Sequence, residues 1–238
     1  PFSRAAADFL MDLGVPAFKI GSGECNNLPL IEHIANFGKP IILSTGMNGL
    51  DSVAAAVSIL TRAQIDFALL HCVNLYPTPH HLLNLGAITQ LRKTFPSAQI
   101  GFSDHSTGNY ASFAAVALGA NIIERHFTDH YDRVGPDISC SIDESGLEDL
   151  IIGCDAIRQA RGGQKTELAE EAVTRNFAYS SVVAISSIQS GDTLTKDNIW
   201  VKRPGTGEIP AADYQKLLGK KATRCISAGK QLRQADYE

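Results

Sequence analysis

Two histidines stand at the ends of two neighbouring β-rich runs. His105 follows the run at residues 99–103, and His126 ends the run at residues 121–126. If both runs are parallel strands of one sheet, their carboxyl ends lie at the same edge and the two imidazoles can share one ligand. Two neutral imidazoles with open positions can hold a divalent ion that acts as a Lewis acid on a carbonyl. A hydrogen-bonded structural pair is the alternative.

A second group of residues has the chemistry of an anion site. Lys19 and Ser22, set among glycines, end one β-rich run, and Ser44 ends the next. Glycine lets backbone N–H groups approach an anion closely, so a phosphate or carboxylate would fit there. A surface lysine beside a glycine turn is the plainer interpretation of the first run. The agreement of two adjacent runs favours the anion site.

Polar side chains also follow the third run, at residues 67–72. Asn74 and Tyr76 can present an amide and a phenol to a polar ligand. Cys72 lies inside the apolar run, which is typical of an inert core residue rather than a nucleophile. Further along, Asp137 in a Gly-Pro-Asp turn can bind sugar hydroxyls or simply form the turn.

The elements that must position these residues alternate along the chain. β-rich runs at 17–20, 40–44, 67–72, 99–103 and 121–126 are separated by amphipathic runs at 28–37, 51–63, 84–94, 109–118 and 144–160. Such alternation predicts an α/β fold with a parallel sheet. Polar residues at every strand end, and no G-x-G-x-x-G after the first, favour a TIM barrel over a doubly wound sheet. A complete (β/α)8 barrel has eight strands in about 250 residues, so we expect roughly three β/α units, about 100 residues, ahead of Pro1.

A small second domain is predicted after the barrel. Residues 1–162 are assigned to the partial barrel, the polar residues 163–176 to a linker, and residues 177–238 to a mostly-β module with runs at 181–185, 199–203 and 222–226 and a short helix at 211–218. About 60 residues cannot enclose a large active site of their own.

Composition narrows the possible functions. The chain has 238 residues, of which 44% are hydrophobic and 19% charged, with a formal net charge of -4. No basic stripe suggests nucleic acid, and no segment predicts a membrane span or a signal peptide. Its five cysteines have no C-x-x-C spacing, which indicates reduced thiols and a cytoplasmic protein.

Taken together, the motifs resemble those of the bacterial N-acetylneuraminate (sialic acid) synthases and their legionaminate and pseudaminate relatives. The resemblance covers essentially the whole chain and rests on KIGSGE (19–24), ILSTGM (42–47), HCVNLYPTP (71–79), GFSDHS (101–106), ERHFTD (124–129), GPD (135–137) and VKRPG (201–205). The terminal module is similar to the antifreeze-like SAF domain of those enzymes.

The resemblance implies condensation of phosphoenolpyruvate with N-acetylmannosamine to give N-acetylneuraminate and phosphate. It implies that phosphoenolpyruvate is bound by Lys19, Ser22, Ser44, Asn74 and Ser103, the metal by His105 and His126, and the aminosugar by Tyr76, Asp137, Phe177 and Arg203. A second phosphoenolpyruvate lysine and a glutamate facing the sugar are expected upstream.

The resemblance also implies a cofactor and an assembly. Ligand softness alone would suggest zinc for two histidines, whereas the family uses Mn2+ or Mg2+, whose hard shell is completed by water and substrate oxygens. The SAF arginine, Arg203 here, is expected to reach the partner's barrel in a domain-swapped homodimer.

Three other functions remain open. Lys19 could form a Schiff base in a class I aldolase. The product could be legionaminate or pseudaminate, made from a diacetamido-deoxyhexose. The SAF-like module could recognise carbohydrate beside an inert barrel, although the polar strand ends argue against inertness.

Overall fold

The computed structural model describes residues 1–238, which form two compact units, Pro1–Gly163 and Gln164–Glu238. Each unit has its own hydrophobic core. None of the helices combines the length and the apolar character needed to cross a membrane.

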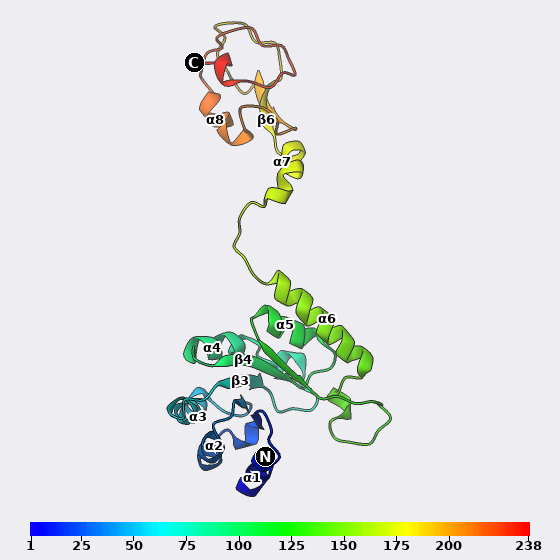
Figure 1. Ribbon diagram of the computed structural model, residues 1–238. Coiled ribbons are helices and arrows are strands. Elements are labelled where there is room, and N and C mark those ends of the chain that lie inside the picture. The colour runs from blue at the N-terminus through cyan, green and yellow to red at the C-terminus, as the bar shows by residue number, and fades with distance from the viewer. The chain divides into compact units, whose positions relative to one another are not determined.

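The first unit alternates strands and helices (Figure 1). In chain order it contains α1 (Arg4–Asp12), β1 (Phe18–Ile20), α2 (Leu28–Ala35), β2 (Ile41–Ser44), α3 (Leu50–Arg62), β3 (Phe67–Cys72), α4 (Gly86–Thr94), β4 (Gln99–Asp104), α5 (Tyr110–Ala117), β5 (Ile122–Arg125) and α6 (Glu144–Ala160). Short 3-10 turns cover Ser22–Glu24, His80–Leu82 and Ile138–Cys140. The five β/α units that the sequence predicts are therefore confirmed.

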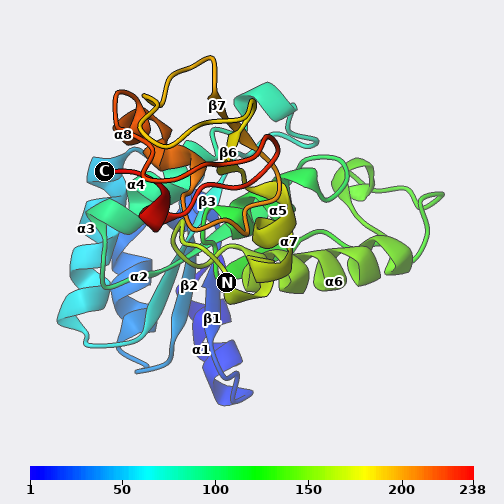
Figure 2. The same cartoon turned by 90° about the horizontal axis from the view of Figure 1, so that it is seen from above.

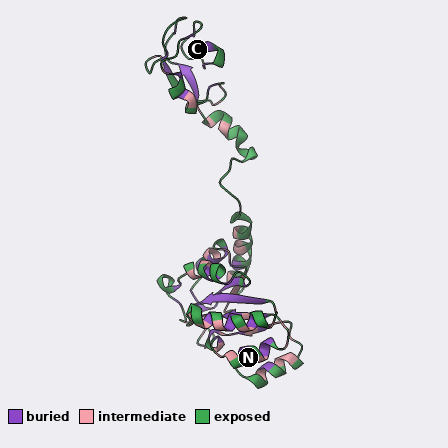
Figure 3. Cartoon of the chain, turned by 90° about the vertical axis from the view of Figure 1, so that its left-hand side faces the viewer, coloured by how far each residue is buried: buried purple, intermediate pink, exposed green.

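Strands β1 to β5 form one parallel sheet in sequential order. The central strands β3 and β4 are buried almost throughout, whereas every residue of the outer strand β5 is half-buried. Figure 3 shows the buried strands against helices whose outer faces are exposed. Helices α2 and α3 contact each other on one side of the sheet (Figure 2).

The sheet is curled like part of a barrel. Neighbouring strands lie about 4.8 Å apart, so the outer strands β1 and β5 would be roughly 19 Å apart in a flat sheet. Yet Lys19 Nζ on β1 lies 3.3 Å from Glu124 Oε2 on β5. Only curvature brings these two side chains together, and the predicted α/β barrel class is confirmed.

Local sequence explains where the first helix begins and ends. Ser3 Oγ accepts a hydrogen bond from the amide of Ala6 at 3.2 Å and caps the N-terminus of α1. Gly14 follows the helix with a φ of 76°, and its amide donates to the carbonyl of Met11. Glycine adopts this left-handed conformation without the steric cost of a Cβ, so the helix stops here.

The second unit is small and mostly irregular. It contains α7 (Ala172–Ala178), β6 (Ser181–Ala184), β7 (Ile199–Lys202) and α8 (Tyr214–Leu217), with β6 antiparallel to β7. Its core includes Val182, Ile199, Leu217 and Leu232. Helix α7 begins inside the segment expected to be a linker.

One predicted strand of this unit is absent as a regular element. Residues 222–226 make only isolated bridges, from Ala222 to Tyr237 and from Ile226 to Ile188. The two ends of the run pair with different partners, so no continuous ladder forms. The sequence indicates a strand at 222–226 but not which backbone N–H and C=O groups lie close enough to pair with it.

Candidate active site

The carboxyl ends of the five strands form a polar rim. The parallel register sets Ser44 opposite Leu70, Cys72 opposite Ser103, and Asp104 opposite Arg125. The strand ends and the loops that leave them carry the predicted barrel site residues. The structure thus brings to one edge residues that are widely spaced in the sequence.

One part of the rim offers positive charge and hydroxyl groups. Lys19 is half-exposed and pairs with Glu124. Ser22 Oγ accepts a hydrogen bond from the amide of Gly46 at 3.1 Å, which ties the loops after β1 and β2 together. Ser44 and Ser103 are buried, and Ser44 Oγ has no hydrogen-bond partner. A buried hydroxyl without a partner is costly unless a ligand satisfies it.

Gly46 is required by the close packing of this rim. A Cβ at this position would lie 1.8 Å from Asn74 Oδ1 and 2.8 Å from Ser22 Oγ. No side chain can be accommodated without moving both groups. Because Gly46 has no side chain, Asn74 and Ser22 can both lie against its backbone.

The aromatic part of the rim surrounds the two histidines. The Tyr76 ring centroid lies 4.1 Å from that of His105 and 5.8 Å from that of His126. Asn74 Nδ2 donates to the Tyr76 hydroxyl at 3.4 Å. Burial raises the pKa of the Tyr76 phenol, so it stays a neutral donor at neutral pH.

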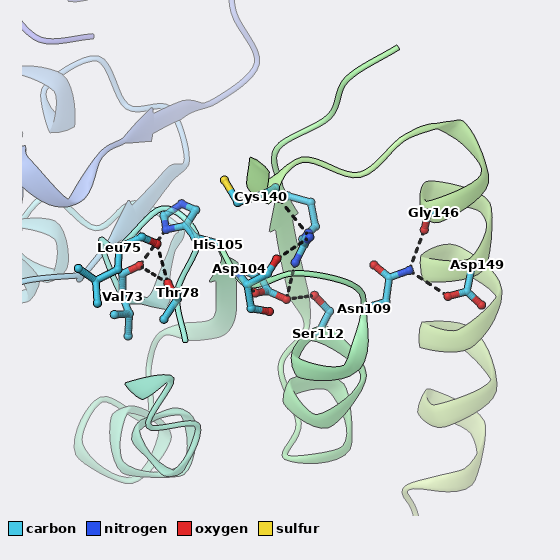
Figure 4. A network of polar contacts seen from close by, with 12 residues as sticks. Val73, Leu75, Thr78, Asp104, His105, Asn109, Ser112, Cys140, Gly146 and Asp149 are labelled. Carbon is cyan, nitrogen blue, oxygen red and sulfur yellow. Dashed lines mark hydrogen bonds and ion pairs between the residues drawn. The ribbon is translucent and has the colours of Figure 1, made fainter. Parts of the chain in front are cut away.

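His105 and His126 lie side by side, with ring centroids 5.1 Å apart. His105 Nδ1 lies 2.9 Å from the carbonyl oxygen of Val73, shown in Figure 4. A carbonyl only accepts, so Nδ1 carries the hydrogen and Nε2 keeps its free lone pair. Burial lowers the pKa of His105, which keeps the ring neutral. His126 Nδ1 lies 3.6 Å from Asp137 Oδ2.

The donor set fits a divalent ion held by two protein ligands. No group of three or more His, Cys, Asp or Glu side chains is placed to hold a metal. The two imidazoles are close together, and the Nε2 of His105 is free. An ion held by these two rings would leave most of its coordination positions to water and substrate oxygens, as Mn2+ and Mg2+ allow.

Cys72 is not equipped to be a nucleophile. Burial raises the pKa of its thiol, and the nearest ring nitrogen, His105 Nδ1, is 3.8 Å from its sulfur. Because that nitrogen already donates to Val73, it cannot remove the thiol proton.

A cavity of about 780 Å³ in the first unit lies beside the rim rather than within it. It is lined by residues of α3, α4 and the loops before them and includes Cys72, but not Lys19, His105 or His126. We place the chemistry at the rim because the two histidines and the charged side chains converge there.

The sequence did not single out a buried ion pair behind the two histidines. Arg125 Nη1 lies 2.7 Å from Asp104 Oδ2, and both side chains are almost fully buried. The available signal was positional, because each residue stands one place before a histidine at the end of adjacent strands. Glu124, the partner of Lys19, was likewise missed.

Phe177 and Arg203 belong to the second unit. Phe177 lies on α7 with 63% of its surface exposed, and Arg203 is exposed directly after β7. Their predicted roles toward the aminosugar stay predictions.

Comparison with known proteins identifies both units. Residues 1–166 match the NeuB family, and residues 179–238 match the SAF domain. The chain belongs to the NeuB family. This NeuB-family chain is 39% identical over 228 residues to the N,N'-diacetyllegionaminic acid synthase of Campylobacter jejuni, covering 94% of the chain and 68% of the relative. It is 37% identical to the N-acetylneuraminate-9-phosphate synthase of Mus musculus, covering 91% of the chain and 60% of the relative.

A solved structure shares the fold of the NeuB-family chain. The N-acetylneuraminic acid synthetase of Leptospira borgpetersenii, crystallised with citrate, matches with a TM-score of 0.70 and 35% identity over 73% of the chain and 61% of the synthetase. The NeuB-family chain thus spans 60% to 68% of the length of these three proteins.

Proposed function

We propose that the intact protein is a nonulosonic acid synthase that condenses phosphoenolpyruvate with an N-acetylated aminosugar. The observation that carries the proposal is the meeting, at one rim, of the histidine pair with a lysine and buried hydroxyls. The pair has the donors for a divalent ion, and the lysine and hydroxyls have the donors for a small anion. The names of the relatives support the same reaction class.

The anionic substrate is assigned to the part of the rim that holds Lys19. The lysine supplies charge, and Ser44 can donate a hydrogen bond without breaking an existing one, because its hydroxyl has no partner. Ser22, Asn74 and Ser103 complete the set of donors. Together they would orient phosphoenolpyruvate and hold its charge away from bulk water.

His105 and His126 are assigned as the ligands of Mn2+ or Mg2+. When bound, the ion supplies Lewis-acid polarisation of a carbonyl. The protein's own contribution is to keep His105 neutral by burial and to fix its tautomer through Val73. Tyr76 packs against both rings and limits access of water to them.

The aminosugar is assigned to Tyr76 and Asp137 on the first unit and to Phe177 and Arg203 on the second. We propose that the second unit serves the barrel of a neighbouring subunit in a two-fold homodimer. Support comes from the SAF match and from the exposed guanidinium of Arg203, which can donate to an N-acetyl carbonyl in a fixed geometry.

We assign N-acetylmannosamine as the aminosugar, which gives N-acetylneuraminate. A second candidate is the 6-deoxy-diacetamido sugar that gives legionaminate, favoured by the 39% identity to the Campylobacter enzyme. Pseudaminate synthesis is the third. Measuring kcat/KM with each sugar at saturating phosphoenolpyruvate separates them.

Metal dependence tests the reaction class. Chelation followed by addition of Mn2+ should abolish and restore turnover, and His126→Ala should lower kcat on the order of 1,000-fold, because it removes one of two ligands. His81→Ala is the matched control, since His81 is an exposed histidine on the turn His80–Leu82. Full turnover after exhaustive chelation contradicts the proposal. Covalent trapping of Lys19 by borohydride and a carbonyl substrate would instead indicate an aldolase.

A further inference from the structure

The ion pair of Asp104 and Arg125 lies directly behind the two histidines. Asp104 is the last residue of β4 and Arg125 the last of β5, and the register sets them opposite each other. Successive side chains of a strand point to opposite faces of the sheet. Glu124 reaches Lys19 on the inner face, so Arg125 points outward and His126 inward.

Both carboxylate oxygens of Asp104 have hydrogen-bond donors. Its Oδ1 accepts from the amide of Ser106 at 2.8 Å, and its Oδ2 accepts from the hydroxyl of Ser112 on α5 at 2.6 Å. Arg125 Nη1 lies 2.7 Å from the same Oδ2 but off the line of a hydrogen bond, so this contact is an ion pair. The carboxylate thus joins β4, the loop after it, α5 and β5.

Arg125 extends the connection to a third segment. Its Nη2 donates to the carbonyls of Ser106 at 3.0 Å and of Cys140 at 3.3 Å. Cys140 ends the turn that follows Asp137, and its amide donates back to the Asp137 carbonyl at 3.1 Å. The guanidinium of Arg125 therefore holds both the loop after His105 and the turn after Asp137, and Asp137 lies beside His126.

Such a pair is poorly explained by stability alone. Removing two charges from water costs several kcal/mol per ion, and well-packed apolar residues at such sites are often equally stable or more so. What apolar residues cannot supply is a fixed set of directions between two strand ends and a loop. The pair is thus better suited to fixing geometry than to adding stability.

We propose that Asp104 and Arg125 are positioning residues that hold His105 and His126 at the separation needed to share one ion. The proposal rests on the function proposed above, because it treats the two histidines as the metal site. Neither residue of the pair touches the substrate. Both act through the backbone that carries the imidazoles and Asp137.

The test replaces the pair with apolar residues of similar size, as Asp104→Leu/Arg125→Met, in the intact protein. We expect the thermal midpoint to fall, because apolar residues can replace the ion pair itself but the buried amide of Ser106 and hydroxyl of Ser112 lose their acceptor. The affinity for Mn2+ alone, measured by calorimetric titration, should fall 10- to 100-fold, as is typical when the groups orienting metal ligands are lost. The kcat should fall about 100-fold, and the KM for phosphoenolpyruvate should change less than about threefold.

Arg161→Met is the matched control. Arg161 also donates to two main-chain carbonyls, those of Val116 and Ala120, but near the opposite end of β5. This variant should keep the parent Mn2+ affinity and kcat. Arg125→Lys keeps the charge but lacks the planar fork, whose Nη2 donates to both carbonyls while Nη1 contacts Asp104. We therefore expect its Mn2+ affinity and kcat to lie between those of the parent and of the double variant.

A stable double variant whose Mn2+ affinity and kcat match the parent would overturn the proposal. If the double variant does not fold, Arg125→Lys decides the question through the imidazole ¹⁵N resonances of the metal-free protein. Shifted resonances of both histidines support positioning, and unchanged resonances overturn it. These spectra require neither metal nor turnover. If the parent does not bind Mn2+, the proposed function is contradicted, and the spectra still test the positioning role of the ion pair.

Discussion

The two units differ sharply in what they bury. Of the fifteen buried polar or charged residues, thirteen lie in the first unit, and only Ser181 and Asp236 lie in the second. The buried side-chain atoms that lack any hydrogen-bond partner, such as Ser44 Oγ, Ser106 Oγ and Asn109 Oδ1, also all lie in the first unit. Burying polar groups is costly, so their concentration in the first unit indicates a role other than stabilising the fold.

The one buried charge of the second unit has a local role. Asp236 Oδ2 accepts from the amide of Arg233 at 2.8 Å, and its Oδ1 accepts from Arg224 Nε at 2.5 Å. These contacts close the last turn of the chain over an apolar core. The first unit thus buries polar groups beneath the rim of its sheet, whereas the second presents charged groups such as Arg203 at its surface.

A large effect is expected from a change that adds no charge and deletes no side chain. Gly46→Ala places a Cβ 1.8 Å from Asn74 Oδ1 and 2.8 Å from Ser22 Oγ, so both side chains must move. A displacement of about 1 Å in a positioned group costs on the order of 100-fold in rate, and we expect that loss in kcat/KM for phosphoenolpyruvate.

Gly86→Ala is the control for this change. A Cβ at Gly86 meets nothing within 4 Å, and the residue opens α4. Activity should be unchanged and stability equal or slightly higher, because alanine favours the helix. Equal activity in Gly46→Ala and Gly86→Ala would show that the rim does not depend on the packing of Asn74.

Arg203→Ala tests the surface role assigned to the second unit. Loss of a charged hydrogen bond costs about 1.5 to 3 kcal/mol, so kcat/KM for the aminosugar should fall roughly 10- to 100-fold. The KM for phosphoenolpyruvate should change little, because its donors all lie on the first unit. An equal loss toward both substrates would contradict the assignment.

Mixing two variants with lowered activity refines the same comparison. Full-length His126→Ala and Arg203→Ala subunits are mixed, and their exchange is verified with two tags. In a swapped mixed dimer, the intact barrel of the Arg203→Ala chain meets the intact SAF domain of the His126→Ala chain. Turnover should therefore rise above that of either variant. If it does not, each SAF domain serves its own barrel.

The smallest effect concerns a buried histidine of the first unit that the proposed chemistry does not use. His71 Nε2 lies 2.7 Å from the carbonyl oxygen of Leu83, and burial lowers the pKa of the ring. Below pH about 6.5 the unfolded chain binds a proton that folded His71 does not, so stability falls as pH decreases toward the lowered pKa. The slope is at most about 1.4 kcal/mol per pH unit.

His71→Gln should remove this dependence, because glutamine donates to Leu83 without titrating. Denaturant unfolding between pH 7 and pH 5 should show the stability gap between parent and variant narrowing as the pH falls. His81→Gln is the control at an exposed site. Parallel curves for the parent and His71→Gln would mean that His71 binds its proton equally well when folded.

The sequence by itself determined the order of elements and the position of the rim. Strands such as 67–72 are continuous apolar runs between amphipathic helices, and that periodicity needs no tertiary information. The rim followed because parallel strands place their carboxyl ends together, so Lys19, His105 and His126 could be assigned to one edge. The same kind of local periodicity predicted helix α6 over its full range of 144–160.

Only the tertiary structure decided which of these residues touch and what lies behind them. The pairing of Lys19 with Glu124 depends on the curl of the sheet. The burial of Arg125 depends on its packing against Asp104 and the turn at Cys140. The failed strand at 222–226 has the same cause, because backbone partners far away in sequence decide whether a ladder continues. Periodicity is a local property, whereas contacts between distant segments arise from three-dimensional packing, which outweighs local preference.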